Sequence, residues 1–280
     1  VTARGWEDLS EILKSYEELQ VEIGEELIGE FLQKEEIARD FAGYYRLYEK
    51  YKSDYQIQEI LDGNVTSGQL KTCCDMGKKA SFEERFTVTE MLLEAVTERI
   101  SVFQKTDEKT EKLYRNLKLL KVFLQEKNSV EAMEQFIASR RKALDAKICS
   151  ELLTAEEAAR EEEQIRILEE YFFQLKELHI SDVAEGIEQI GERFGNVCRL
   201  RNEKLEETKK MLEHAFSFLE ECFGEGQELL LFETGLTGDD RCSIFISQYG
   251  CPSYFKHCEL LLYSKKENEL RKECRDLLEE

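Results

Sequence analysis

The sequence predicts an all-α protein, built as an elongated helical bundle with long antiparallel helical hairpins and a smaller C-terminal module. Charged residues make up 35% of the 280 residues, and the chain contains one proline. This composition is typical of long helices rather than of sandwiches or barrels. Apolar residues also recur at intervals of three and four along most of the chain. Only residues 224–263 depart from this pattern, so we expect a bundle over 1–223 and a module over 224–280 packed on it.

The N-terminal region predicts two helices followed by a break. Apolar positions at helical spacing over residues 6–31 predict one long helix, bent at its glycines. An aromatic stripe over residues 41–55 is interpreted as helix packing rather than a base-stacking platform, because few basic residues interleave with it. Residues 62–68, DGNVTSG, predict a loop. A short helix over 69–76 then ends at Gly77.

Two start signals divide the following stretch. Ser81 and Glu84 form a predicted capping box that opens a helix reaching about residue 102. Thr106, followed by two acidic residues, predicts the start of another helix. One buried line is expected on that second helix: Leu113, Leu117, Leu120 and Leu124.

Residues 155–223 predict a long helical hairpin of coiled-coil type. Thr154 and Glu157 form a second capping box. Only Ile180 and Ser181 separate the first predicted helix from the next, so the arms are expected to fold back on each other. On the first arm the seam residues are Ala158, Ile165, Leu168, Phe172, Leu175 and His179. On the second arm they are Val183, Ile187, Ile190, Phe194 and Val197, and after a polar interval Leu205, Leu212, Phe216, Leu219 and Phe223. We expect this hairpin to carry most of the stability.

The C-terminal module leaves two interpretations open. Residues 228–248 fit either a β-hairpin or a pair of helices, and we favour helices. Gly250 is expected to stop a helix, and Pro252 to start a final one. In either case, the apolar density predicts that this segment is buried against the bundle.

No stretch matches a catalytic, nucleotide-binding or metal-binding motif. A zinc site at Cys242, Cys251, His257 and Cys258 is disfavoured because paired ligand spacing is missing. Asp239, Asp240 and Arg241 are interpreted as a charged turn rather than an acid–base group. We therefore predict no catalytic, cofactor-binding or metal-binding residue, no cofactor, and no enzymatic activity.

Charge and cysteine content restrict the partners and the compartment. The formal net charge of −21 disfavours nucleic acid and anionic membranes as partners. No apolar run approaches the length that spans a bilayer. An odd count of nine cysteines, two of them adjacent, predicts reduced thiols and a cytoplasmic location. The start at Val1, without methionine, is compatible with a fragment of a longer protein.

One segment carries a family resemblance. Residues 245–263, FISQYGCPSYFKHCELLLY, resemble a recurrent ending of uncharacterised cytoplasmic proteins from anaerobic Gram-positive bacteria. The resemblance covers about a tenth of the chain. It implies a bacterial helical protein of unknown function, and it carries over no active-site residue.

The expected function is a non-enzymatic, intracellular protein–protein interaction or scaffold role. The predicted partner-binding residues are Tyr249, Tyr254 and Phe255, because aromatic side chains are the types that anchor interfaces. The partner is expected to be a protein, which the sequence does not identify, and homo-oligomerisation stays open. The alternatives are a membrane-associated helical scaffold, or an enzyme whose site is assembled from dispersed carboxylates.

Overall fold

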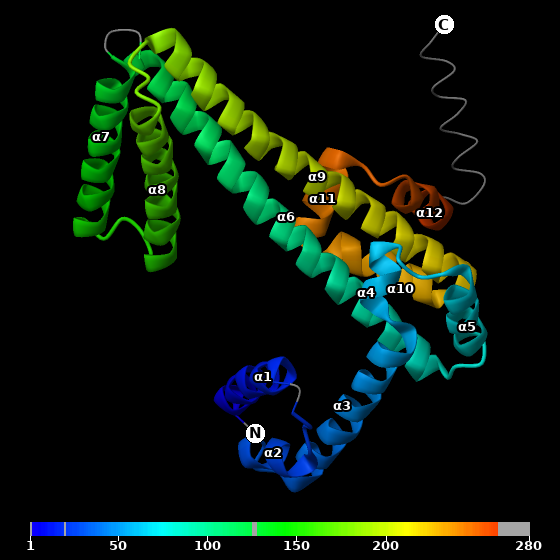
Figure 1. The fold of residues 1–280 in the computed structure, drawn as a ribbon. Helices are drawn as coiled ribbons and strands as arrows, with labels where there is room; N and C mark the ends of the chain where they lie inside the picture. The colour runs from blue at the N-terminus through cyan, green and yellow to red at the C-terminus, as the bar shows by residue number, and fades with distance from the viewer. Residues whose placement is uncertain (1, 20, 125–127, 263–280) are drawn as a thin grey trace, which may run out of the picture. The chain divides into compact units, whose positions relative to one another are not determined.

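Every regular element in the part of the chain that the structure describes is a helix, which confirms the all-α class (Figure 1). The computed structural model describes residues 2–19, 21–124 and 128–262. The helices are α1 (Ala3–Glu18), α2 (Glu25–Phe31), α3 (Glu35–Tyr55), α4 (Ile57–Asp62), α5 (Ser67–Gly77), α6 (Phe82–Leu124), α7 (Ser129–Cys149), α8 (Ala155–Glu177), α9 (Val183–Phe223), α10 (Gln227–Gly238), α11 (Asp240–Tyr249) and α12 (Pro252–Leu262).

The chain divides into two compact units. Unit 1 combines residues 1–97 with 210–280, and unit 2 comprises residues 98–209. Unit 1 is therefore discontinuous in sequence, and the long helices α6 and α9 each begin in one unit and end in the other. Residues 224–262 belong to unit 1, and the expected domain boundary after residue 223 stays a prediction.

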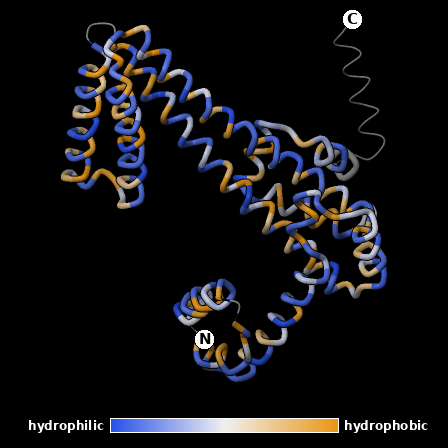
Figure 2. Tube along the Cα trace, in the orientation of Figure 1, coloured by the Kyte–Doolittle hydropathy of each residue, from blue (hydrophilic) through white to orange (hydrophobic). Residues whose placement is uncertain are grey.

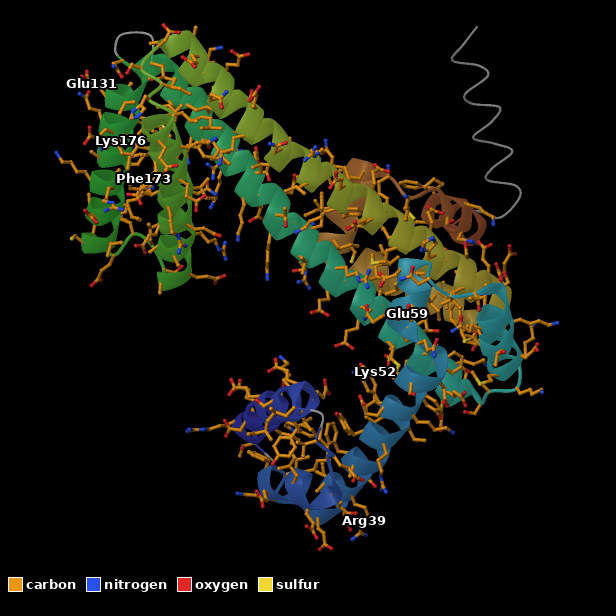
Figure 3. All side chains as sticks on the ribbon, viewed as in Figure 1. Arg39, Lys52, Glu59, Glu131, Phe173 and Lys176 are labelled. Atoms are coloured by element: carbon orange, nitrogen blue, oxygen red, sulfur yellow. A yellow bond between two sulfur atoms is a disulfide. The ribbon has the colours of Figure 1, made fainter. Side chains whose placement is uncertain are left out.

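The first helical stretch is two helices rather than one, so the predicted long bent helix is wrong. Helix α1 ends at Glu18, and α2 starts at Glu25 after an extended Gly24. The glycine thus precedes a helix instead of bending one. Helices α1, α2 and α3 share a small core, whose buried members are Leu9, Ile28, Leu32, Ala38 and Ala42. Arg39, labelled in Figure 3, joins α3 to α2 through an ion pair of 3.4 Å with Glu25.

The aromatic stripe of α3 contributes to packing, as expected. Tyr45 and Tyr55 are both buried, and each hydroxyl lies 2.9 Å from a carboxylate oxygen, of Glu17 and Glu84 respectively. The Tyr55 ring also packs edge-on against Phe218 of α9. Tyr45 and Tyr55 therefore contribute to helix packing, whereas Tyr44 is 49% exposed.

Helix α6 runs without interruption from Phe82 to Leu124, so the helix start predicted at Thr106 is wrong. The Thr106 hydroxyl donates a hydrogen bond to the Val102 carbonyl one turn earlier, at 3.1 Å. Threonine in a helix interior commonly satisfies its hydroxyl in this way instead of capping. The Ser81 cap at the true start is present, since its Oγ accepts from the Glu84 amide at 3.2 Å.

Unit 2 is formed by the second part of α6, by α7 and α8, and by the first part of α9. The Thr154–Glu157 capping box at the start of α8 is confirmed in both directions. Arg193 of α9 bonds to Gln174 and to Glu170 of α8, so α8 contacts the first part of α9. The predicted hairpin over residues 155–223 is not one structural unit, because residues 210–223 belong to unit 1 and α8 packs along α7. The buried core of unit 2 comprises Leu113, Leu120, Leu124, Ala132, Met133, Phe136, Ile137, Leu144, Ile165, Leu168, Tyr171, Leu175, Ile180 and Ile190.

Hydropathy along the helices follows this packing. Figure 2 shows hydrophobic residues spaced among hydrophilic ones along α6 to α9, rather than gathered in one long run. Such spacing places one apolar stripe on each helix and leaves the opposite face for water.

Residues 228–248 are helices α10 and α11, so the structure selects helices over the β-hairpin. Gly250 follows α11 with a φ of 76°, a left-handed value that favours glycine, and Pro252 is the first residue of α12. The described residues of this segment pack on other parts of unit 1. Phe232 of α10 meets Phe216 of α9 edge-on at 5.2 Å between ring centroids. Gly235 lies close to Leu93 of α6, where a Cβ would come within 2.2 Å of a methyl group.

The prediction that the cysteines are reduced thiols is wrong for one pair. Cys74 of α5 and Cys222 of α9 form a disulfide, although both lie in helical segments. Helical cysteines can pair when the two helices pack side by side, because the geometric limit concerns the distance between the two residues and not their secondary structure. The free cysteines among the described side chains are Cys73, Cys149, Cys198, Cys242 and Cys251.

Candidate partner-binding site

The start of α12 is fixed to α9 by polar contacts. The Ser253 hydroxyl donates to Glu213 at 2.5 Å, and the Ser253 amide lies 3.4 Å from the same carboxylate. One turn later, Lys256 pairs with Glu220 at 3.2 Å, and His257 bonds to the same carboxylate. Glu213 and Glu220 are seven residues apart, so they lie on one face of α9. The first turns of α12 are therefore held in one position along α9.

His257 is the buried member of this set. Its side chain is 2% exposed, and its ring stacks on Phe216 with 5.8 Å between centroids. Burial tends to raise the pKa of the Glu220 carboxyl, but the hydrogen bonds from His257 and Lys256 outweigh it and hold that pKa below its ordinary value. Glu220 thus stays ionised and keeps both partners in place.

The predicted partner-binding residues lie at the two sides of the turn between α11 and α12. Tyr249, at the end of α11, places its ring 5.2 Å from that of Phe245. The Tyr254 hydroxyl lies 2.8 Å from the Thr237 Oγ of α10, and its ring meets Phe255 edge-on at 5.5 Å. Phe255 is 49% exposed, whereas the two tyrosines are half-buried. The structure therefore brings Tyr254 and Phe255 together and leaves Phe255 as the exposed member.

Glu233 of α10 is an acidic residue that the sequence pattern did not single out. Its side chain is nearly fully buried, and neither carboxyl oxygen has a hydrogen-bond partner. Burial raises the pKa of this carboxyl, and the nearby His257 opposes that shift only in part. The apolar segment around it, ELLLFETGL, predicts that the helix is buried. It gives no signal that the Glu233 side chain is buried as well.

The disfavoured zinc ligands have separate structural roles. The Cys242 thiol contacts the Thr97 hydroxyl at 3.5 Å, and the Cys251 thiol donates to Glu213 at 3.4 Å. Burial raises the pKa of Cys242 to about 11 and that of Cys251 to about 12, so both stay protonated at neutral pH. Among the residues that the structure describes, no three His, Cys, Asp or Glu side chains are grouped to hold a metal ion. The Cys258 side chain lies outside the described residues.

The charged turn between α10 and α11 is a helix cap. Asp239 accepts hydrogen bonds from the amides of Arg241 and Cys242, at 2.9 Å and 3.0 Å, as an N-cap residue does. Its side-chain bond with the Arg241 guanidinium is the main reason that the pKa of Asp239 is lowered. An ionised, capped aspartate suits a structural role better than general acid–base work.

No described helix combines the length and the apolar character needed to cross a membrane. No protein-family model matches the sequence, and comparisons with curated proteins and with solved structures found no significant match. The resemblance of residues 245–263 to proteins of anaerobic Gram-positive bacteria therefore stays a prediction. Any function has to be argued from the geometry of this chain.

Proposed function

We propose that this protein is a non-enzymatic, cytoplasmic scaffold or interaction protein that binds a protein partner through the start of α12. The observation that carries the proposal is Phe255, which is half exposed between residues that are held in place. Ser253 is bonded to Glu213, Tyr254 to Thr237, and both Lys256 and His257 to Glu220.

Rigid presentation of an aromatic side chain favours binding. An exposed side chain on a mobile segment loses conformational entropy when a partner orders it, and this loss weakens binding. Here the four residues around Phe255 are already ordered by the fold, so a partner that covers the ring orders little else. Large aromatic anchors of this kind account for much of the binding energy in many interfaces.

Among the described side chains, each helix of the module contributes one large exposed apolar residue. Leu230 of α10 is 45% exposed, Ile244 of α11 is 50% exposed, and Phe255 of α12 is 49% exposed. Single exposed apolar residues are common on protein surfaces, so Leu230 and Ile244 carry no argument alone. They identify the further positions to probe if Phe255 proves to be an anchor.

A hydrolytic or acid–base enzyme is the weaker hypothesis. Lys256 and His257 of α12 are engaged with Glu220, and the buried Cys251 and Cys242 stay protonated at neutral pH. A nucleophilic cysteine needs the opposite, which is a lowered pKa and access to solvent. The membrane-scaffold alternative is disfavoured by the formal net charge of −21, which repels an anionic membrane surface.

The direct test is site-specific photo-crosslinking in the organism that makes the protein. A benzophenone amino acid replaces Phe255 in one variant and Phe173 in a matched control. Phe173, labelled in Figure 3, lies on α8 in unit 2 and is 59% exposed. We expect a discrete crosslinked protein from position 255 and none of the same mass from position 173. Identical products from both positions, or no product from position 255, would contradict the proposal.

The energetic test follows once the crosslinked partner has been identified by mass spectrometry. Phe255→Ala should weaken binding by about 2 kcal/mol, roughly thirty-fold in Kd, if the ring is an anchor. Tyr254→Phe removes only the hydroxyl that bonds to Thr237 and should weaken binding less. Circular dichroism must show that both variants are folded. A crosslink between two copies of this chain would identify the partner as a second copy.

A further inference from the structure

Helix α5 is attached to unit 1 in an unusual way. Among its 11 residues the buried ones are Cys73, Cys74 and Gly77, all of them small. Its larger apolar residues, Leu70 and Met76, are only partly buried. Two cysteines and a glycine bury little apolar area, so packing alone contributes little to holding this helix in place.

The disulfide supplies the missing attachment. Cys74 is joined to Cys222, in the last turn of α9, across a sequence separation of 148 residues. One turn further along α5, Gly77 lies so close to the Phe223 ring that a Cβ there would come within 2.7 Å of a ring carbon. The helix is thus drawn tightly onto the end of α9 at the point where the covalent bond is made.

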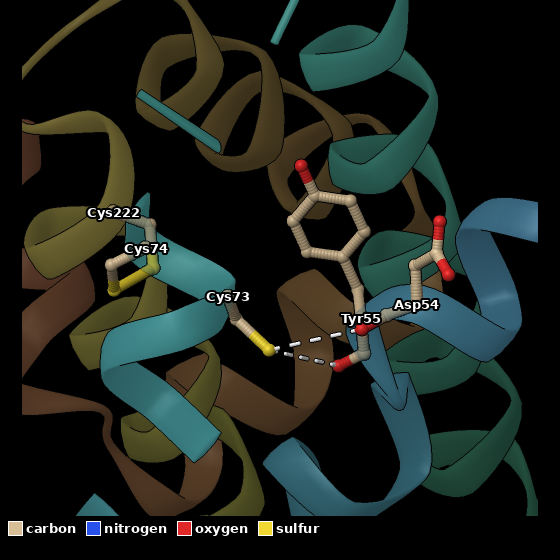
Figure 4. The surroundings of a disulfide bond; sticks show 5 residues. All are labelled: Asp54, Tyr55, Cys73, Cys74 and Cys222. Carbon is tan, nitrogen blue, oxygen red and sulfur yellow. Dashed lines mark hydrogen bonds between the residues drawn. A yellow bond between two sulfur atoms is a disulfide. The ribbon is translucent and has the colours of Figure 1, made fainter. Parts of the chain in front are cut away.

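The neighbouring thiol lies on the other side of α5. Figure 4 shows Cys73 pointing away from the disulfide, with its sulfur 3.9 Å from the carbonyl oxygens of Asp54 and Tyr55. Burial raises the pKa of this thiol. A protonated thiol is a poor nucleophile, so Cys73 does not compete for the disulfide while α5 is docked.

Both ends of α5 allow it to move as one piece. Residues 63–66 precede it and residues 78–81 follow it, and neither segment is helical. A helix of this length is marginal in water without tertiary contacts. Once released, α5 is therefore expected to lose much of its helical structure.

We propose that the Cys74–Cys222 disulfide is a redox switch, in which reduction releases α5 and uncovers the end of α9. In the reducing step a dithiol attacks the disulfide as a thiolate, forming a mixed disulfide and liberating one protein thiolate. The second thiol of the reductant then closes its own disulfide and liberates the other. Two electrons pass to the protein, and two protons complete its thiols. The reaction uncovers the Cys222 thiol and the Phe223 ring, which α5 covers in the oxidised form.

The switch is consistent with a protein that otherwise keeps its thiols free. In a reducing compartment, persistent structural disulfides are rare, and the pairs that do form there are usually redox-responsive. The described part of the chain contains one disulfide beside five free cysteines, which is the pattern of a single responsive pair rather than of a disulfide framework.

The experiment compares hydrogen exchange in the oxidised protein and after treatment with dithiothreitol. Alkylation of the denatured, unreduced protein should first show two fewer reactive thiols than the reduced protein. Amides over residues 67–77 should then exchange at least ten-fold faster after reduction, while those of α1 and α2 should change little. Reoxidation should restore the slow exchange.

Three variants distinguish the switch from general effects of replacing a cysteine. Cys73→Ser should keep the response, because Cys73 is not part of the bond. Cys74→Ser should exchange rapidly over residues 67–77 with or without reductant. Cys149→Ser, which changes an exposed thiol in unit 2, is the matched control.

Three results would overturn the proposal. Equal thiol counts before and after reduction would mean that the bond does not form. Unchanged exchange over residues 67–77 would mean that packing alone holds α5. Loss of protection throughout residues 1–97 would show a structural staple instead of a local switch.

Discussion

Helices α5 and α8 lie in different units and are attached to their surroundings by different means. Helix α8 buries Ile165, Leu168, Tyr171 and Leu175 on one face, and these residues belong to the main core of unit 2. Helix α5 buries only two cysteines and a glycine, and a disulfide joins it to α9. One helix is held by apolar area, the other by a covalent bond.

The difference determines how each attachment responds to the environment. Apolar burial is nearly insensitive to redox conditions and changes slowly with temperature near 25 °C. A disulfide holds fully or not at all, according to the reductant that reaches it. A chain with both kinds of helix can release one element while the rest of the fold persists.

Removing the disulfide should have the largest effect on stability. Replacing Cys74 and Cys222 together with alanine should lower the unfolding free energy of unit 1 by about 4–5 kcal/mol, since the bond closes a loop with a separation of 148 residues. Urea unfolding followed by the fluorescence of Trp6, in α1, reports on this unit. A loss below about 1 kcal/mol would show that packing contributes more to the attachment of α5 than its buried residues indicate.

Leu168→Ala should produce the next largest loss, confined to unit 2. Leu168 is fully buried in the core, so we expect a loss of about 3–4 kcal/mol. Hydrogen exchange resolved by peptide should show the change in residues 98–209. Phe173→Ala, on the exposed face of the same helix, is the control and should cost less than about 0.5 kcal/mol. Equal losses of unfolding free energy for Leu168→Ala and Phe173→Ala would show that the buried face of α8 contributes no more to stability than its exposed face.

Buried Glu233 should make the stability of unit 1 depend on pH. Its pKa is raised in the folded state, so the native protein binds more protons than the unfolded chain above the ordinary glutamate pKa. This contribution therefore favours folding at acidic pH, and it is lost as pH rises through the raised pKa. Glu233→Gln cannot ionise, so it should be more stable than wild type at pH 8 and show no such gain below about pH 4. An equal gain in stability at both pH values would show that ionisation of the Glu233 carboxyl is not the cause.

The smallest expected effect concerns the start of α8. Thr154→Ala removes the side chain that accepts from the Glu157 amide at 3.2 Å and should cost about 1 kcal/mol. Thr154→Ser keeps the hydroxyl and should lose much less. Thermal unfolding of the two variants measures the difference. If both lose the same amount, the methyl group of Thr154 and not the cap accounts for the loss.

Local signals in the sequence were sufficient for the all-α class and for several helix ends. The capping box at Thr154, the glycine stop at Gly250 and the proline start at Pro252 are each confirmed, because each depends on hydrogen bonds or backbone angles within a few residues. Thr106 shows the limit of such signals. The same side chain can cap a helix or bond back within one, and the packing of the flanking turns decides between them.

Amphipathic spacing predicted that α8 and α9 each bury an apolar stripe, and the short link predicted contact between them. It did not predict that α8 also packs along α7, or that α9 continues into unit 1. The contacts between distant segments were decided by the tertiary structure alone. Nothing near Cys74 identifies Cys222, nothing near Glu233 indicates an unpartnered carboxyl, and nothing near Phe255 shows that Glu213 and Glu220 hold its neighbours. Pairing across such separations depends on which helices pack side by side, and the chain acquires that information only when its apolar faces are buried together.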